Sequence, residues 1–399
     1  MTSRIGLVLT GGGARGAYQA GVIRGLADLA PAGSPQPFRI LVGTSAGAIN
    51  AVALAGATGD FAATASALWD TWADLTPDRI FRTDLASIAP LALRWARDLA
   101  LGGLLDRSTS THLLDTAPLR ALLAARLDPD RVAENIRSGR LHAVAISATS
   151  YRSGTAVTFF SGAPEVQPWS RSSRVGVRAR LGLAHVMASA AIPGFFPPEP
   201  YAGTYWGDGC IRLTAPLSPA IHLGADQVLA IGTRHARPPA LARSGAFAPM
   251  PRISAIDVGG VLLNAVFLDA LEADLERMLR INRTISRLGT AATGELREIP
   301  VEVVVPSQDL GRLAAAELRR LPRTLRYMLR GLGASDETGW DVLSYLAFDR
   351  TYTRRLLELG RADAHAAAAT LGPLIGSAQA LRVGAEGRIT CAPSTRGGP

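Results

Sequence analysis

The sequence predicts an α/β fold organised around a sheet with parallel strands. Two short apolar segments, at Ile5–Leu9 and 40–44, have the composition of buried strands, and each runs into a glycine-rich turn followed by helix-forming residues. Two strand–turn–helix units in succession normally place their strands side by side and parallel, so we expect both turns at the same edge of the sheet. The 399 residues, 48% of them hydrophobic, are enough for a full core.

The first turn contains three successive glycines, Gly11, Gly12 and Gly13, followed by Arg15 and Gly16. The run satisfies the Gly-x-Gly-x-x-Gly pattern of dinucleotide-binding proteins, but the acidic residue that this interpretation requires at the end of the second strand is missing. Three glycines also allow successive backbone N–H groups to point at one place, as an oxyanion hole requires. We expect Arg15 to hold the loop or to meet an anionic head group, or else simply to pair with a nearby carboxylate.

The second turn places Ser45 between Gly43 and Gly47. Gly-x-Ser-x-Gly between a strand and a helix is typical of a nucleophile on a sharp turn, where glycines leave room for the backbone. The N-terminus of the following helix favours negative charge that develops beside the serine.

A nucleophilic serine needs a base, and none of the six histidines lies in a glycine turn suited to catalysis. Asp208, in contrast, lies between two glycines after an aromatic pair. A carboxylate beside Ser45 can take the hydroxyl proton directly if an apolar site raises its pKa. The alternatives are that Asp208 is an ordinary turn residue and that the base is His222, His235 or His365.

The remaining predicted elements alternate between helices and strands. We expect helices at 61–75, 118–127, 181–191 and 216–223, one long helix at 255–285, and two or three further helices between 310 and 371. We expect a hairpin of strands at 141–146 and 155–160, a strand at 227–231, and a strand at 301–305 that returns to the same sheet. The apolar, arginine-fringed segment at 80–105 is expected either to pack on the sheet or to cap a lipid site or contact a membrane.

Taken together, these motifs resemble those of the patatin-like phospholipase family, and of its bacterial members in particular. The resemblance rests on residues 11–16, 43–47 and 208–209, is supported by 188–198 and 216–231, and covers most of residues 5–232. It implies a three-layer α/β/α patatin-like fold with a mostly parallel central sheet and a C-terminal helical extension. The corresponding limits are a catalytic domain at 1–305, a helical extension packed on it at 306–371, and a flexible tail at 372–399.

The resemblance also implies a serine lipid acyl hydrolase of the phospholipase A or lysophospholipase type. Ser45 and Asp208 would form a catalytic dyad that works through an acyl-enzyme. The oxyanion hole would be formed by the amides of Gly11, Gly12 and Gly13, with Arg15 beside it. The motif glycines would be Gly16, Gly43, Gly47 and Gly209, and no metal or cofactor is expected.

Cys210 departs from the family pattern, because the family usually carries Gly or Ala at this position. We expect its side chain to fill a small space rather than to shift the Asp208 turn. Two alternatives to a lipid hydrolase stay open, namely a general carboxylesterase or thioesterase on the same site and a non-catalytic lipid-binding regulator.

The positive charge of the chain comes from arginine alone, because the sequence has 42 arginines and no lysine. The net charge is +9. It indicates either a compositional bias or attraction to anionic membranes, and no nucleic-acid-binding motif accompanies it. Cys210 and Cys391 cannot build a disulfide framework or a metal site. Without a signal-peptide pattern or a membrane-spanning run, we expect a cytoplasmic protein, peripheral at the inner face of the membrane, that acts on lipid.

Overall fold

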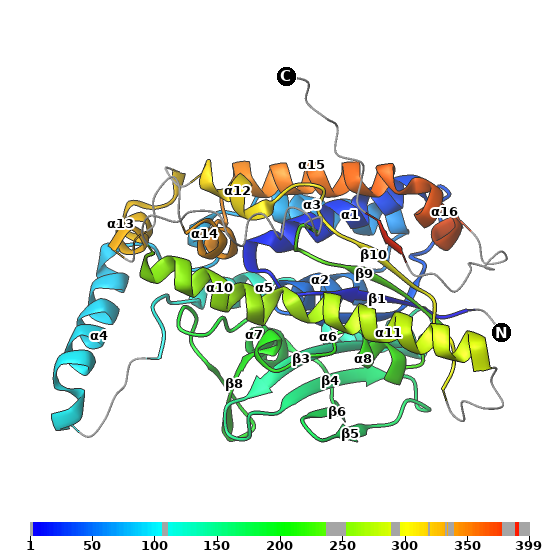
Figure 1. Cartoon of the computed structure of the whole chain (residues 1–399), viewed down its shortest axis with the longest axis horizontal. Helices are drawn as coiled ribbons and strands as arrows, with labels where there is room; N and C mark the ends of the chain where they lie inside the picture. Colours follow the sequence, from blue (N-terminus) through cyan, green and yellow to red (C-terminus); the bar gives the residue numbers. More distant parts are fainter. Residues whose placement is uncertain are drawn as a thin grey trace.

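A single mixed sheet forms the centre of the molecule (Figure 1). The computed structural model describes residues 3–105, 111–236, 253–288, 296–317, 320–331, 333, 339–376 and 388–390. The strands are β1 (Ile5–Leu9), β2 (Phe38–Thr44), β3 (Ala143–Ser150), β4 (Ala156–Gly162), β5 (Trp169–Arg171), β6 (Arg174–Arg178), β7 (Glu199–Tyr201), β8 (Thr204–Asp208), β9 (Gln227–Ile231), β10 (Val301–Val304) and β11 (Arg388–Thr390). The main path runs β11-β10-β9-β1-β2-β3-β4-β6-β5, and it is parallel from β11 to β3.

Helices and short 3-10 turns connect the strands. They are η1 (Gly13–Arg15), α1 (Gly16–Leu29), α2 (Ala46–Ala55), α3 (Phe61–Ala73), η2 (Pro77–Arg79), α4 (Leu85–Leu105), α5 (Ala117–Ala124), α6 (Pro129–Arg137), α7 (Leu183–Ser189), η3 (Gly209–Ile211), α8 (Ser218–His222), α10 (Ala255–Phe267), α11 (Asp269–Leu288), α12 (Leu310–Ala315), α13 (Arg323–Gly331), α14 (Trp340–Leu346), α15 (Arg350–Ala366) and α16 (Ala368–Gly376).

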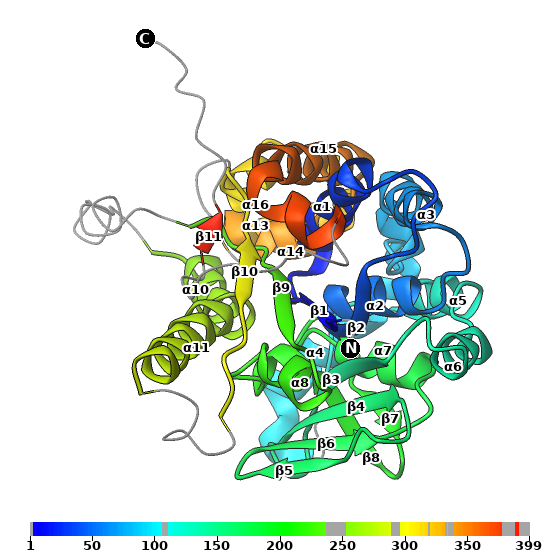
Figure 2. The ribbon, with the colours of Figure 1, turned by 90° about the vertical axis from the view of Figure 1, so that its right-hand side faces the viewer.

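Two apolar cores lie on opposite faces of this sheet. Because side chains alternate along a strand, Leu7 and Leu9 of β1 join one core while Val8 joins the other. The first core is covered mainly by α1, α2, α3 and α15, and the second by α8 and α11. Figure 2 shows α10 and α11 on one side of β9 and β10 and α1 on the other. The predicted three-layer α/β/α architecture with a mostly parallel sheet is therefore confirmed.

The hairpin and the late strand are also confirmed, since β3 pairs antiparallel with β4 and β10 pairs parallel with β9. The single helix predicted at 255–285 is wrong. α10 ends at Phe267 and α11 starts at Asp269; Leu268 between them stays in the right-handed helical region, but its φ of −117° is far from the regular α-helical value. Phe267 and Leu268 are both buried at this break. α10 contacts α14, and α11 covers the sheet.

The C-terminal part contains more helices than predicted. Five helices, α12 to α16, follow β10, because Asp309 and Asp349 each start a new helix as an N-cap. α16 continues beyond residue 371, and β11 adds a strand beside β10 within the segment predicted as a tail. The other residues of that segment, from 377 onward, lie outside the described residues, as does Cys391.

α15 packs so closely on α1 that glycines form the contact. A Cβ at Gly21 of α1 would overlap the carbonyl oxygen of Leu357, and a Cβ at Gly360 of α15 would overlap the carbonyl oxygen of Tyr18. The first and last parts of the chain therefore share one tightly packed core.

We expect Gly21→Val to lower the free energy of unfolding by about 1–3 kcal/mol, because the added carbons must push α15 away from α1. The matched control is Gly372→Ala in α16, where a Cβ meets open space, and this variant should be as stable as the wild type or slightly more so. Chemical unfolding measures both. Wild-type stability in Gly21→Val would contradict the close contact.

Candidate active site

Ser45 lies at the sharp turn between β2 and α2. Its φ of 56° and ψ of −128° are strained for a residue with a side chain, a conformation that is found mainly at functional sites. A Cβ at Gly47 would overlap the carbonyl oxygen of Leu9, so the neighbouring strand β1 permits only glycine there. Ser45 precedes α2 without capping it through its hydroxyl, which leaves the hydroxyl available for chemistry.

Ser189 holds the backbone of the Ser45 turn. The N–H of Ser45 donates to Oγ of Ser189 at 2.9 Å, and this hydroxyl donates in turn to the carbonyl oxygen of Ser147 at 2.6 Å. Ser189 is completely buried. Its supporting role was not predicted; the only sequence signal was that it lies within the family-like segment at 188–198.

Strand pairing brings Asp208 to Ser45. In the parallel pair β2–β3, Thr44 lies opposite Ser147, and the next residue of β3, Ala148, lies opposite Asp208 of β8. The backbone N–H of Asp208 donates to the carbonyl of Ala191 at 3.1 Å. β4 pairs along the other edge of β3, so β8 continues the edge that β2 leaves after Thr44, and the two predicted residues meet there at the carboxyl edge of the sheet.

The turn after Asp208 orients its carboxylate. Oδ1 of Asp208 accepts the backbone N–H of Cys210 at 2.9 Å, and a Cβ at Gly209 would overlap the carbonyl oxygen of Ser147. The sulfur of Cys210 lies against Gly11, where a Cβ would overlap it. The cysteine thus occupies the space beside the glycine loop, while its backbone holds the carboxylate.

Burial dominates the electrostatics of Asp208. The residue is 0% exposed, and burial raises its pKa to about 7, while the neighbouring Ser45 hydroxyl and Cys210 lower it and offset the effect only in part. In the described part of the chain, Oδ2 of Asp208 has no hydrogen-bond partner. A carboxylate with a pKa near neutrality and a free oxygen is well suited to accept a proton.

The glycine loop lies directly beside Ser45. A Cβ at Gly11 would come within 3.0 Å of the Cβ of Ser45, and the Gly11 carbonyl accepts the hydroxyl of Thr233 at 2.7 Å. Gly13 has a φ of 57°, which favours glycine. In the described part of the chain, no hydrogen bond occupies the N–H of Gly12 or Gly13. Both groups are free to bind an oxyanion.

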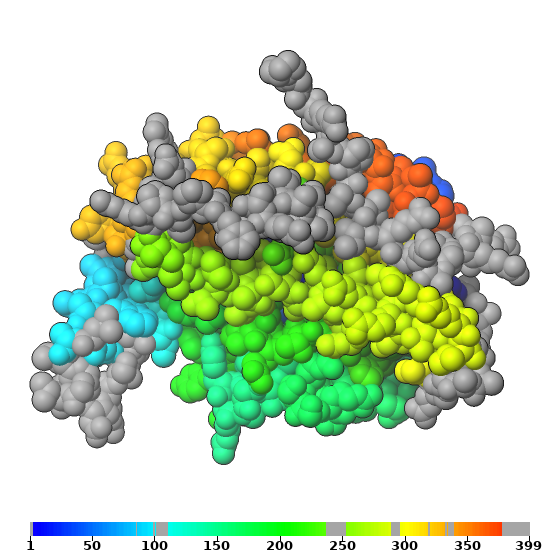
Figure 3. Space-filling view, viewed as in Figure 1, coloured from blue at the N-terminus to red at the C-terminus, as the bar shows by residue number. Residues whose placement is uncertain are grey.

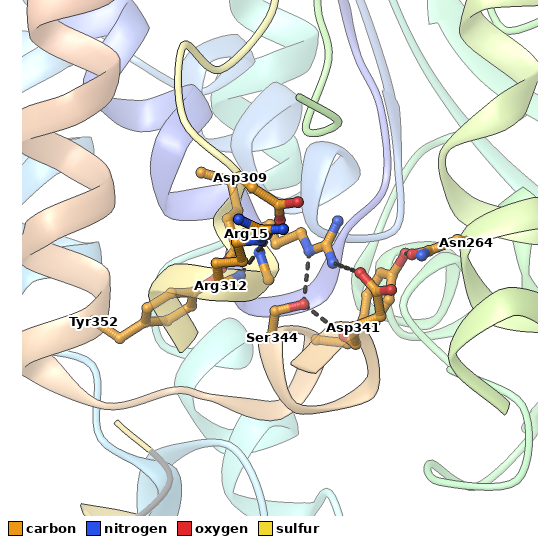
Figure 4. A network of polar contacts seen from close by, with 10 residues as sticks. Arg15, Asn264, Asp309, Arg312, Asp341, Ser344 and Tyr352 are labelled. Atoms are coloured by element: carbon orange, nitrogen blue, oxygen red, sulfur yellow. Dashed lines mark hydrogen bonds and ion pairs between the residues drawn. The ribbon is translucent and has the colours of Figure 1, made fainter. Parts of the chain in front are cut away.

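The Arg15 side chain pairs with a carboxylate. It is 3% exposed, its Nε donates to Ser344 at 2.8 Å, and a terminal nitrogen pairs with Asp341 at 3.1 Å (Figure 4). The backbone N–H of Arg15 donates to the carbonyl of Gly12 at 3.1 Å. Of the roles considered for Arg15, the contacts favour holding the loop and pairing with a carboxylate over meeting a head group.

An apolar cavity of about 600 Å³ begins at Ser45 and extends along α2. Ile49 and Ala53 follow Ser45 at intervals of four residues and line one wall, because residues four apart share a helix face, and Ala57 lines the cavity from the segment just after α2. The opposite walls come mainly from α3 and α5, and Arg126 and Arg131 lie at the outer end. The mostly apolar lining suits an apolar chain.

The other candidate bases lie elsewhere. None of the six histidines makes a hydrogen bond or ring contact with Ser45 or Asp208 among the described interactions; His222, for example, stacks on Trp169, and His365 lies against Asp28. Within the described residues, no group of three or more metal-ligating side chains comes together. No helix in the same residues has the length and hydropathy to cross a bilayer.

The chain was compared with known proteins. A family model described as Patatin-like phospholipase matches residues 7–221. A search of curated proteins found no matching sequence.

The raised pKa of Asp208 predicts a pH-dependent stability. Because the folded state holds this proton up to about pH 7 while an unfolded aspartate loses it near pH 4, the contribution is present at low pH and is lost as pH rises through 7. Asp208→Asn cannot ionise and so removes this pH dependence. The melting temperature of the variant minus that of the wild type should therefore be larger at pH 8 than at pH 5. The control is Asp130→Asn, whose side chain is 83% exposed. Equal gains at both pH values would contradict the buried protonated carboxyl.

Proposed function

The chain belongs to the patatin-like phospholipase family, whose members are lipid acyl hydrolases, and we propose that it is a serine hydrolase of the phospholipase A or lysophospholipase type. The observation that carries the proposal is the buried pair of Ser45 and Asp208 beside a glycine loop with free N–H groups. The pair provides a nucleophile and a base, and the loop provides donors for the charge that forms on the substrate.

In the proposed reaction, the Ser45 hydroxyl attacks the ester carbonyl carbon while Asp208 takes its proton. The carbonyl oxygen becomes negative and receives hydrogen bonds from the amides of Gly12 and Gly13. When the tetrahedral intermediate collapses, the alcohol leaves with the proton from Asp208, and the acyl group stays on Ser45. Water, deprotonated by Asp208, then releases the fatty acid by the same route.

The cavity along α2 supports a long acyl chain as the substrate. Ala53 lies about 12 Å along the helix from Ser45, given a rise of about 1.5 Å per residue. Small side chains at Ala53 and Ala57 keep this space open. An acyl chain bound there places its ester carbon at the Ser45 end, next to the glycine loop.

Peripheral contact with an anionic membrane is part of the proposal. α10 and α4 expose apolar side chains, with Leu93 73%, Val261 69% and Leu262 62% exposed. Figure 3 shows both helices at the surface, α4 in cyan and α10 in yellow-green. The exposed Arg94 on α4 and the net charge of +9 favour a negatively charged lipid surface.

We expect the wild type to release fatty acid from phospholipid vesicles, and Ser45→Ala and Asp208→Asn to fall to near background, because each variant removes one partner of the proton transfer. The wild-type kcat/KM should rise as pH passes through about 7, where Asp208 becomes ionised. On anionic vesicles the activity should fall as salt rises.

Three results of this assay would contradict parts of the proposal. Full activity in Asp208→Asn but none in Ser45→Ala would require a different base. Salt-independent activity on anionic vesicles would argue against electrostatic membrane contact. A wild type that binds vesicles without releasing fatty acid would favour the lipid-binding regulator.

We expect Ala53→Phe to lower kcat/KM for long-chain esters while activity on butyrate esters is kept, because the ring blocks the cavity beyond Ile49. The control is Ala62→Phe, which lies exposed on α3 and does not line the cavity. Chain-length profiles of the three proteins measure the effect. An unchanged profile in Ala53→Phe would show that the chain binds elsewhere, and a wild-type preference for short soluble esters would favour a general carboxylesterase.

A further inference from the structure

The glycine loop is in contact with α14, an element outside residues 7–221. The carbonyl oxygen of Tyr345 lies so close to Gly13 that a Cβ there would overlap it. Tyr345 itself is 1% exposed. The backbone of α14 therefore packs directly on Gly13 and restrains its conformation.

Arg15 connects the same loop to α14 through its side chain (Figure 4). Its guanidinium donates to Ser344 and Asp341 and lies 4.6 Å from the centre of the Tyr345 ring. The hydroxyl of Ser344 donates its hydrogen to the carbonyl oxygen of Asp341 at 2.5 Å. The Ser344 oxygen is therefore oriented to accept the hydrogen bond from Arg15. Three successive contacts thus hold a single arginine two residues after Gly13.

The charge on Arg15 is matched by its surroundings. Burial acts to lower the pKa of its guanidinium, but Tyr345, Tyr352, Asp341 and Asp309 outweigh burial and raise it. Because burial raises the pKa of both tyrosines, the negative charge that faces Arg15 at neutral pH comes from the two aspartates. Arg15 therefore stays protonated. A buried cation that lost these partners would be left uncompensated, and the loop that carries it would have to move toward solvent.

α10 supports α14 from the other side. The Tyr345 hydroxyl donates to Asn264 at 3.1 Å, and the rings of Tyr345 and Phe267 lie 5.2 Å apart. Phe267 also reaches Gly11, where a Cβ would come within 3.3 Å of its ring. Both ends of the three-glycine segment are thus covered by residues from the last third of the chain.

We propose that Asp341, Ser344 and the backbone of Tyr345 are positioning residues that hold the amides of Gly12 and Gly13 in place for the oxyanion. The proposal rests on the proposed function. Glycine has the greatest conformational freedom of all residues, so three in succession do not hold a fixed orientation by themselves. The donors act only within a few tenths of an ångström of their ideal position, and α14 provides the restraint.

The test uses the full-length protein with p-nitrophenyl butyrate, a soluble ester that leaves most of the acyl cavity empty. In Ser344→Ala and Asp341→Asn we expect kcat to fall about 10- to 100-fold and KM to stay within about threefold, because the oxyanion forms only in the transition state. The two variants should also exchange the backbone amide hydrogen of Arg15 in the glycine loop, which donates to the Gly12 carbonyl, faster than the wild type.

The matched control is Asp28→Asn. Asp28 pairs with Arg361 of α15 and so joins the same N- and C-terminal parts of the chain, but it does not contact the glycine loop. We expect this variant to lose stability while kcat and the exchange of the loop stay at wild-type values. Melting temperatures of all variants separate folding from positioning.

Wild-type kcat in folded Ser344→Ala and Asp341→Asn would overturn the proposal, as would an equal fall of kcat in Asp28→Asn. If the wild type has no Ser45-dependent esterase activity, the proposed function fails, and the exchange measurement still decides the role of α14. Unchanged exchange in the glycine loop would then overturn it, and faster exchange confined to the two α14 variants would support it.

Discussion

The pairing of β8 with the end of β3 determines where the chemistry of this molecule can take place. Asp208 is brought to Ser45 because Thr44 of β2 and Asp208 of β8 lie opposite successive residues of β3, Ser147 and Ala148. A shift of one residue in the pairing of β8 with β3 would turn the carboxylate to the other face of the sheet. The glycine loop, the serine turn and Ser189 are all arranged around this edge.

Two kinds of buried polar group lie near the site: some have all their hydrogen bonds and support the loops, whereas Asp208 does not. Beneath the loops, the buried amides of Gln19 and Asn50 hydrogen-bond each other, the Thr10 carbonyl and the Trp72 ring nitrogen. This network is fully engaged and rigid. Asp208 instead keeps one oxygen without a complete hydrogen bond, at a cost in stability that the surrounding core has to offset.

The sharp turns at Ser45 and Asp208 could be predicted from the sequence because their signals are local. The glycines around Ser45 and Asp208 are required by contacts within a few residues or across neighbouring strands, and they appear as short motifs. The break at Leu268 could not be predicted, since an apolar residue there continues the helical pattern and only tertiary packing ends the helix. The partner of Arg15 could not be predicted for a similar reason. Asp341 lies 326 residues away in the sequence, and no local pattern marks it.

The wide separation in sequence between Arg15 and α14 affects the order in which the protein acquires its structure. A ribosome that synthesises this chain delivers Ser45 first, then Asp208, and Tyr345 after both. The glycine loop therefore meets α14 only after Ser45 and Asp208 have been synthesised. Under the proposed function, we expect a nascent chain that lacks α14 to carry both residues beside a glycine loop that is less well restrained.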